Sequence, residues 1–348
     1  MESSHLVSRS RLRAHEAPCR LALTEFAGLR VLVAGDFMLD EYLWGQVECI
    51  SPEAPVAIVD VERETHTLGG AGNVVNNLVS LGAKAEVLGL VGDDHPGNLL
   101  RQKMVRLGVD DTGLIIDPQR RTSRKTRVIG NSQQLVRIDR ESRAPAGPEF
   151  LETAGRFLRD RLHVIDAIVI SDYAKGTLTA NLLQEVISKG RSRGVPVVVD
   201  PKGPDYSCYA GATVITPNRK EVEQATSRSL SRWEDIVQAG NGLLKELSLE
   251  QLLITLGPEG MLLFSKQSSE IHLPTQAREV FDVSGAGDTV AAVMALGLAN
   301  WRNPLLAATV ANIAAGVVVG KMGTAPISHE ELEKELAGKD IGLETNIP

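Results

Sequence analysis

Short runs of unbroken apolar residues alternate along the chain with longer stretches of helical spacing. The apolar runs are Arg30–Gly35, Glu86–Val91, Ala167–Ile170, Pro196–Asp200, Thr213–Thr216 and Gln251–Leu256. The stretches with helical spacing are Asn73–Leu81, Gly97–Leu107, Glu149–Leu162, Thr179–Arg191 and Ser231–Leu247. Buried parallel strands have unbroken Val, Ile and Leu runs, so the pattern predicts an α/β fold with a mostly parallel sheet covered on both faces. Such sheets bind ligands beyond the carboxyl ends of their strands.

Two segments have the two-residue period of strands with one solvated face. Ala54–Val61 and Thr122–Asp139 alternate apolar and polar residues, the second around a turn at Gly130 and Asn131. We expect these segments to form a small antiparallel flap, inserted near residues 52–67 and 120–140, that serves as a lid or as a dimer contact. We expect the rest of residues 29–340 to form one domain and residues 1–28 to be a disordered extension.

Composition narrows the class of protein. The chain has 348 residues and a net charge of −7, which disfavours general binding to nucleic acid or to an anionic membrane surface. Its three cysteines, Cys19, Cys49 and Cys208, are too few and too far apart for a disulfide framework or a cysteine zinc site, and they fit a reducing cytoplasm. The uncharged stretch Asn303–Gly320 contains Asn and Pro and predicts a buried helix, not a membrane span.

The most informative motif is Gly285-Ala286-Gly287-Asp288, which directly precedes an apolar helical run. Small residues before a helix leave backbone N–H groups free to bind an anion such as a phosphate. Asp288 then stands in the first helical turn, either as a partner of the helix dipole or as a base that takes a proton from an attacking hydroxyl. Val290 replaces the third glycine of a dinucleotide fingerprint, and the sequence contains no P-loop.

A second glycine motif begins at Gly69. Gly70 permits close backbone approach, and the amide of Asn73 can donate to and accept from sugar hydroxyls, although the segment also reads as a helix start after a glycine turn.

The two glycine motifs and the intervening Leu90–Asp94 segment occur in the order found in ribokinase-like (phosphofructokinase B) carbohydrate kinases, and the chain resembles that family from Leu29 to Leu336. The resemblance implies a ribokinase-like three-layer sandwich with a small β lid, ATP as co-substrate and Mg²⁺ as cofactor. It places the ATP site at Asn218, Glu221, Thr255, Gly257, Gly285 and Asn312. Glu221 would hold Mg²⁺ through water. Asn218 and Glu221 also fit a helix cap with a first-turn acid, and Asn312 fits a buried cap.

Within the family, several further segments are similar to those of heptose 7-phosphate kinases. They are Gly35–Gly45, Ile50–Val56, Gln133–Asp139, Ser171–Gly176 and Asp200–Gly203. This similarity implies ATP-dependent phosphorylation of D-glycero-D-manno-heptose 7-phosphate at its anomeric C1 hydroxyl, in ADP-heptose biosynthesis for lipopolysaccharide core. A kinase for another sugar, or a non-catalytic sugar- or nucleotide-binding regulator, is the alternative. The printed chain has no His-x-Gly-His motif, so we expect a separate nucleotidyltransferase to act later. The resemblance also suggests a homodimer through the flap.

The resemblance and the residue types together suggest individual roles. Asp288 would be the base, and the amides of Ala286 and Gly287 would hold the transferred phosphoryl group. The sugar would be bound by Asp36, Gly70, Asn73, Arg137 and Lys175, the last two holding its phosphate. Asp40 is the lesser candidate beside Asp36, and Lys202 would face the phosphoryl group or pair with a carboxylate. Arg124, Lys125 and Arg127 are weaker phosphate ligands, because basic residues on exposed strands are usually solvated.

Overall fold

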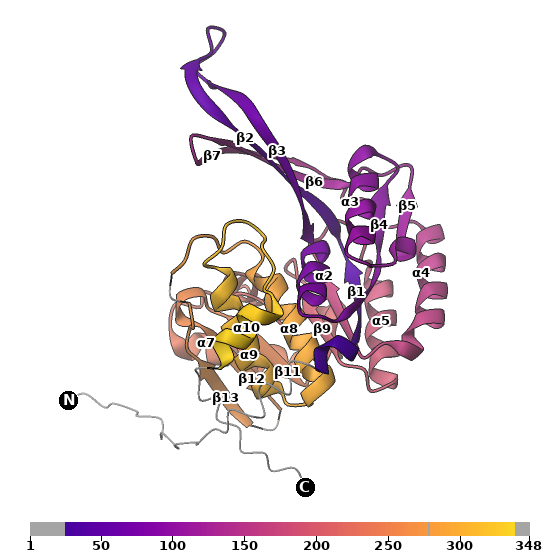
Figure 1. Ribbon diagram of the computed structural model, residues 1–348. Coiled ribbons are helices and arrows are strands. Elements are labelled where there is room, and N and C mark those ends of the chain that lie inside the picture. The colour runs from indigo at the N-terminus through magenta and orange to yellow at the C-terminus, as the bar shows by residue number, and fades with distance from the viewer. Residues whose placement is uncertain (1–24, 267, 278, 338–348) are drawn as a thin grey trace, which may run out of the picture.

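A computed structural model describes residues 25–266, 268–277 and 279–337, and it shows a nine-stranded sheet between two layers of helices (Figure 1). The strands are β1 (Arg30–Gly35), β4 (Lys84–Gly92), β5 (Leu114–Asp117), β8 (Ala167–Ser171), β9 (Val197–Asp200), β10 (Val214–Ile215), β11 (Gln251–Thr255), β12 (Met261–Ser265) and β13 (Ser268–Leu273). Their order is β13-β12-β11-β10-β9-β8-β1-β4-β5, and only the pairs that involve β12 and β13 are antiparallel. The predicted mostly parallel sheet is therefore confirmed.

Alternate side chains of the strands pack into two separate hydrophobic cores. In β1, Val31 and Val33 belong to one core, and Leu32 and Ala34 belong to the other. The first core includes residues of α2 (Ala71–Ser80), α3 (His95–Arg106), α8 (Ala286–Trp301), α9 (Pro304–Val318) and α10 (His329–Leu336). The second includes residues of α4 (Pro148–Arg161), α5 (Ala180–Ser192), α6 (Arg219–Thr226) and α7 (Trp233–Glu246). This arrangement is the three-layer sandwich expected from the sequence.

The uncharged stretch near the C-terminal end of the sequence forms α9, a buried helix, as expected. None of the helices in the described part of the chain is both long enough and apolar enough to cross a membrane.

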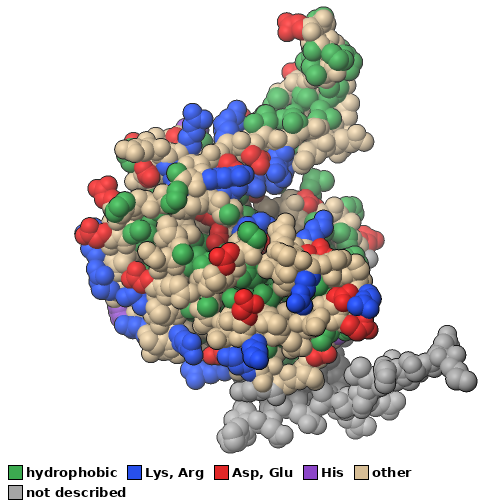
Figure 2. All heavy atoms as spheres, turned by 180° about the vertical axis from the view of Figure 1, so that it is seen from behind, with side chains coloured by type: hydrophobic (Ala, Val, Ile, Leu, Met, Phe, Trp, Pro, Cys, Tyr) green, Lys and Arg blue, Asp and Glu red, His purple; other side chains and the backbone are tan. Residues whose placement is uncertain are grey.

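The lid is a second sheet that projects from the body (Figure 1). It contains β2 (Phe37–Ile50), β3 (Ala57–Gly70), β6 (Ser123–Gly130) and β7 (Gln133–Arg140), in the order β3-β2-β6-β7. Figure 2 shows hydrophobic side chains gathered along its projecting end.

The lid differs from the expected flap in two ways. The expectation of an all-antiparallel flap was wrong, because the central pair, β2 and β6, is parallel. The flap is also larger than expected, because β2 belongs to it. The first residues of β2 are buried without interruption, so this part of the strand lacks the polar alternation that marked the other segments.

Of the expected extension, residues 1–24, and with them Cys19, lie outside the described residues. The remaining four form a short 3-10 helix, η1 (Glu25–Gly28), and its Phe26 is fully buried in the first core.

The chain changes direction across the sheet at β1. From β1 it proceeds to β4 and β5 on one side, and later to β8, β9, β10 and β11 on the other. Ligands of open α/β sheets bind at this switch point, beyond the carboxyl ends of the strands. The two central strands meet closely there, since a Cβ on Gly35 would overlap the carbonyl oxygen of Ser171.

Two glycines of α7 offer a matched test of how tightly this helix packs on the sheet. A Cβ on Gly240 would overlap the ring of Phe264, whereas a Cβ on Gly242 would meet nothing within 4 Å. We expect Gly240→Ala to lower the free energy of unfolding by about 1–3 kcal/mol through overpacking. Gly242→Ala should raise it by up to about 1 kcal/mol, because alanine favours helix. Urea denaturation of both variants measures this, and equal effects would contradict the packing described.

Candidate active site

Asp36 follows β1 and organises the loop that follows β8. Its carboxylate is 2% exposed and accepts hydrogen bonds from the backbone N–H groups of Tyr173 (2.9 Å), Lys175 (3.0 Å) and Thr177 (3.3 Å). Three donors to one carboxylate fix the course of this loop at the switch point. The structure therefore gives Asp36, expected as a sugar ligand, a direct part in positioning Tyr173.

Asp288 lies in the first turn of α8, where two side chains from distant parts of the chain meet it. The Tyr173 hydroxyl donates to its Oδ1 at 2.8 Å, and the Asn73 amide donates to its Oδ2 at 2.8 Å. Gly285, at the N-cap, has a φ of 81°, and a Cβ there would lie 2.5 Å from the Asn73 Nδ2 atom. A side chain at position 285 would thus strain the backbone and push Asn73 away from Asp288.

The carboxyl group of Asp288 has a pKa near neutrality. Burial raises this pKa to about 6, while the hydrogen bonds from Asn73 and Tyr173 oppose the rise. Asp288 is 3% exposed. A carboxylate with a pKa in this range can accept a proton from a substrate hydroxyl at physiological pH.

Asn73 has an unused hydrogen-bond acceptor beside this carboxylate. The residue is 1% exposed, and its Oδ1 atom has no hydrogen-bond partner among the described residues. Buried polar atoms are rarely left unpaired, so the atom fits a hydroxyl donor supplied by a ligand.

A second group of charges lies at the ends of β9 and β10. The Lys202 Nζ atom is 2.7 Å from Glu221 Oε1. Asp200 is close enough to Gly287 that a Cβ there would be 3.9 Å from Asp200 Oδ2. Burial and the negative charges of Asp288 and Glu221 hold the pKa of Asp200 well above its usual range. Carboxylate oxygens that repel one another are the donors that suit a hard divalent cation such as Mg²⁺.

The residues expected around ATP meet in part beside this group. Asn218 and Glu221 form a capping box at the start of α6, which is the structural alternative considered from the sequence. Asn218 also pairs with Thr255 in an isolated bridge between the ends of β10 and β11, and Gly257 follows with a φ of 60°. These residues therefore share one edge of the sheet, next to Lys202.

Other predicted residues have partners elsewhere. The Asn312 amide donates to the carbonyl oxygen of Pro274 at 2.7 Å, which ties α9 to the segment after β13. Arg137 lies on β7 and pairs with Asp139 at 2.8 Å. Lys175 pairs with Glu141 at 2.6 Å.

The sequence analysis assigned no role to two residues of this site, Tyr173 and Asp200. Tyr173 follows β8 and Asp200 is the last residue of β9, and both lie in segments that resembled heptose kinases. Their position at the end of a strand and this resemblance were the only available signals, because Asp288, which the Tyr173 hydroxyl contacts, lies 115 residues away along the chain.

The remaining cysteines show no activated thiol. Cys49 is exposed, and burial raises the pKa of Cys208 to about 11. Neither thiol therefore has the lowered pKa of a reactive cysteine.

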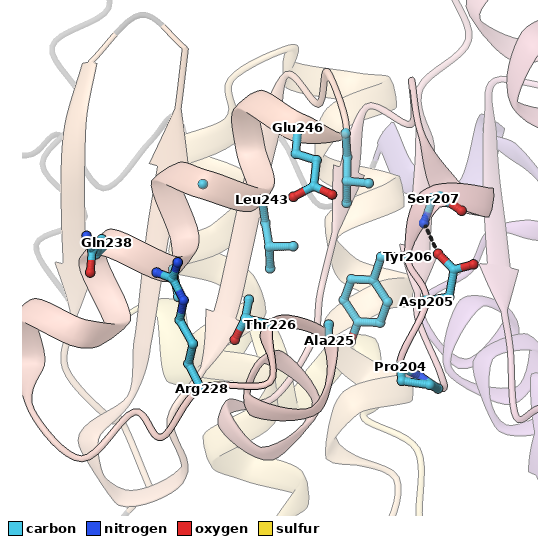
Figure 3. Close-up of a pocket in the computed structure, with 13 residues that line it drawn as sticks. Pro204, Asp205, Tyr206, Ser207, Ala225, Thr226, Arg228, Gln238, Leu243 and Glu246 are labelled. Atoms are coloured by element: carbon cyan, nitrogen blue, oxygen red, sulfur yellow. Dashed lines mark hydrogen bonds between the residues drawn. The ribbon is translucent and has the colours of Figure 1, made fainter.

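A separate cavity of about 250 Å³ lies between the segment Pro204–Ser207 and helices α6 and α7 (Figure 3). The side chains of Tyr206, Leu243 and Glu246 border it. None of the residues predicted from the sequence lines this cavity, so the candidate site is the group around Asp288.

Comparisons with known proteins identify the family of the chain. Residues 30–331 match the sequence profile described as pfkB family carbohydrate kinase. The chain is 48% identical to a protein named bifunctional protein HldE of Syntrophotalea carbinolica, over 93% of this chain and 66% of that protein. It is 52% identical to the protein of the same name of Geotalea uraniireducens, over 88% of this chain and 63% of that protein. The chain therefore spans slightly less than two thirds of the length of these relatives.

Solved structures share the fold at low sequence identity. Phosphofructokinase-2 of Escherichia coli, in complex with potassium, has a TM-score of 0.73 at 19% identity, over 89% of this chain and 99% of that chain. Ribokinase of Arabidopsis thaliana, complexed with ribose and ATP, has a TM-score of 0.68 at 20% identity, over the same shares. These likenesses confirm the ribokinase-like fold.

Two tyrosine–aspartate pairs make the electrostatics of the site testable. Tyr173 donates to Asp288, while the hydroxyl of Tyr209 donates to Asp172, whose pKa burial likewise raises to about 6. A hydrogen bond to the ionised carboxylate lowers its pKa, so its removal raises it. We expect Tyr173→Phe to raise only the pKa of Asp288, and Tyr209→Phe only that of Asp172.

Carbon-13 NMR titration of labelled aspartate carboxyl groups measures both values, with the two resonances assigned by Asp→Asn variants. A shift of both pKa values in either tyrosine variant, or of neither, would contradict the hydrogen bonds described.

Proposed function

The chain belongs to the pfkB family of carbohydrate kinases, and on this basis we propose that it transfers the γ-phosphoryl group of ATP to the anomeric C1 hydroxyl of D-glycero-D-manno-heptose 7-phosphate. The product is the 1,7-bisphosphate, an intermediate of ADP-heptose synthesis. Support for the choice of heptose comes from the similar sequence segments and from the 48–52% identity to proteins named bifunctional protein HldE.

The observation that best supports this reaction is the position of the Asp288 carboxylate at the N-terminus of α8. It is buried, has a pKa of about 6, and stands beside the amide of Gly287, which has no intrahelical acceptor because it lies in the first turn. One position can therefore offer a proton acceptor to a hydroxyl and N–H donors to a phosphoryl group.

The reaction needs one proton transfer and one phosphoryl transfer. Asp288 accepts the proton of the C1 hydroxyl, and the C1 oxygen forms a bond to the γ-phosphorus while the bond from that phosphorus to the β-phosphate oxygen breaks. The amide of Gly287 would hold the oxygens of the transferred phosphoryl group. The amide of Ala286 donates to the carbonyl oxygen of Val283 at 3.3 Å and would join it once that bond is released. Tyr173 and Asn73 hold the carboxylate in place, and the free Oδ1 of Asn73 accepts from a sugar hydroxyl.

Asp200 and Glu221 are the residues that would hold Mg²⁺, directly or through water. When bound, the ion supplies positive charge that neutralises the β- and γ-phosphates. The same edge of the sheet holds Asn218, Thr255 and Gly257, which would contact the nucleotide next to Asp200 and Glu221.

Replacement of the proposed base should separate chemistry from binding. We expect Asp288→Asn to lower kcat by about 10²–10⁴-fold, the usual contribution of a general base, while the affinity for Mg-ATP changes little. Steady-state kinetics and calorimetric titration with ATP measure the two quantities. Near-normal turnover in this variant would exclude Asp288 as the base.

A panel of acceptors tests the substrate. We expect ADP release from Mg-ATP with D-glycero-D-manno-heptose 7-phosphate and little with fructose 6-phosphate or ribose. Turnover with one of the other sugars and not with the heptose would support the assignment as a kinase and contradict the proposed substrate. ATP or sugar binding without ADP release from any of the three would favour a non-catalytic regulator.

We also propose a homodimer formed through the lid. Apolar side chains on it are unusually exposed, among them Ile58 (43%), Val61 (47%), Val136 (49%) and Ile138 (40%). Exposed apolar patches of this kind mark protein interfaces, and a second copy of the lid offers a complementary apolar surface.

A charge placed on this surface should dissociate the dimer. We expect Val136→Asp to halve the mass measured by light scattering after size exclusion, because burying an unpaired carboxylate is costly. Val105→Asp is the matched control, since Val105 is more exposed (58%) than Val136 and lies on α3, outside the lid. A wild-type monomer, or a dimer that Val136→Asp leaves intact, would contradict the proposal.

A further inference from the structure

Lys202 places its ammonium group beside the two carboxylates that are proposed to hold Mg²⁺. Its Nζ atom is 2.7 Å from Glu221 Oε1. Asp200 lies two residues before it in the chain. Burial raises the pKa of Asp200, and the positive charge of Lys202 opposes this rise. The ammonium group therefore supplies positive charge at the position where the metal ion would supply it.

The backbone of Lys202 is held in place, whereas its side chain is free to move. The Lys202 N–H group donates to the Tyr209 hydroxyl at 3.1 Å, and the same hydroxyl is 3.1 Å from the Lys202 carbonyl oxygen. Tyr209 is buried, so this anchor is rigid. The side chain of Lys202 is 45% exposed, in contrast to 10% for Glu221. A flexible lysine stem on a fixed backbone can change its partner without a movement of the loop.

Glu221 does not need Lys202 for its structural role. Its Oε2 atom accepts from the backbone N–H group of Asn218 at 2.9 Å and so completes the capping box of α6. The contact with Lys202 is made by the other oxygen, Oε1. Glu221 can therefore exchange the ammonium group for another cation while the helix cap stays intact. A divalent cation attracts the pair of carboxylates more strongly than a single ammonium charge does.

A buried hydroxyl near the same carboxylates lacks a partner. Burial and the negative charges of Glu221 and Asp200 raise the pKa of Tyr206. Tyr206 is 3% exposed, and its hydroxyl has no hydrogen-bond partner among the described residues. Because buried polar groups are rarely unpaired, this hydroxyl independently indicates that a ligand binds beside Asp200 and Glu221.

The transferred phosphoryl group would lie close to this pair of carboxylates. A Cβ on Gly287, whose amide is proposed to hold the phosphoryl oxygens, would be 3.9 Å from Asp200 Oδ2. An ammonium group that leaves Glu221 would therefore be next to a group that carries negative charge in the transition state. Charge-assisted hydrogen bonds from lysine to phosphoryl oxygens are among the stronger polar contacts in proteins.

We propose that Lys202 changes partner during the reaction: binding of a divalent cation by Asp200 and Glu221 releases its ammonium group, which then donates a hydrogen bond to the transferred phosphoryl group. The inference rests on the proposed function, because it takes these two carboxylates to hold the metal ion. Lys202 keeps its proton throughout and stabilises charge only, while Asp288 accepts the proton of the hydroxyl. The two roles that the sequence left open for Lys202 are then successive states of one side chain.

A second lysine in a similar ion pair provides a matched control. Lys321 is 2.6 Å from Glu331, which completes the capping box of α10 as Glu221 completes that of α6. Lys202→Met and Lys321→Met each remove one such ion pair, and Lys202→Arg retains the charge. Electron paramagnetic resonance measures the binding of Mn²⁺, as a probe for Mg²⁺, to each protein without nucleotide. Steady-state kinetics at saturating Mg-ATP measure kcat with whichever sugar the wild-type enzyme phosphorylates.

The exchange predicts two effects of opposite direction. We expect Lys202→Met to tighten Mn²⁺ binding by about 3–10-fold, because the metal ion no longer displaces an ion pair or meets an ammonium group. We expect the same variant to lower kcat by about 10–100-fold, the range for losing a hydrogen bond between charged groups. Lys202→Arg should bind Mn²⁺ as weakly as the wild type and recover part of kcat, and Lys321→Met should change neither quantity.

A purely structural ion pair would behave differently. Its loss would lower Tm by a similar small amount in both Lys→Met variants and would alter neither Mn²⁺ binding nor kcat. Unchanged or weaker Mn²⁺ binding in Lys202→Met, an unchanged kcat, or equal effects of Lys202→Met and Lys321→Met would overturn the inference.

Two further variants separate this inference from the proposed metal site. If Asp200→Asn and Glu221→Gln weaken Mn²⁺ binding but Lys202→Met does not tighten it, the metal residues stand and the exchange fails. If neither carboxylate variant weakens Mn²⁺ binding, the assignment of the metal residues fails and the exchange fails with it. Because kcat is measured with the sugar that is turned over, a wrong choice of heptose as substrate leaves the test of Lys202 intact.

Discussion

The site depends on one buried carboxylate, that of Asp288, and on the two side chains that donate to it. Asn73 comes from α2, Tyr173 from the loop after β8, and Asp288 from α8, so the bonds join segments separated by 115 and 215 residues. Ionising a buried acid is costly, and only well-placed donors keep its pKa as low as about 6. The tight meeting of β1 with β8, the anchoring of the loop by Asp36 and the glycine at position 285 all serve this placement.

Charge is distributed unevenly between the two sheets. The edge of the central sheet carries the acids Asp172, Asp200 and Glu221, with Lys202 against the last of these. On one face of the lid the cations Lys125, Arg127 and Arg137 outnumber the carboxylates of Asp40 and Asp139. A molecule with a hydroxyl at one end and a phosphate at the other would have a preferred direction in such a field, before any specific contact forms.

Much of the fold could be predicted from the sequence, because each buried strand has an unbroken apolar run and each helix a clear period. The Gly285–Asp288 motif likewise indicated the helix N-terminus and its acid. The lid was predicted less well, because the start of β2 is buried on both faces and looks like the end of the central sheet. The role of Tyr173 could not be predicted, since it depends on Asp288, a side chain that is 115 residues away along the chain.

The connection between the lid and the body has a mechanical consequence. The β2–β3 ribbon begins one residue after Asp36 and ends three residues before Asn73, and Phe37 pairs with Gly70 at its base. The base of the ribbon therefore lies next to Asp36, which anchors the loop of Tyr173, and close to Asn73, which donates to Asp288. A displacement of the ribbon at its base would therefore move the residues that contact Asp288. If a ligand bound to the lid shifts the ribbon in this way, linkage requires that the alignment of the base affects binding at the lid by the same factor.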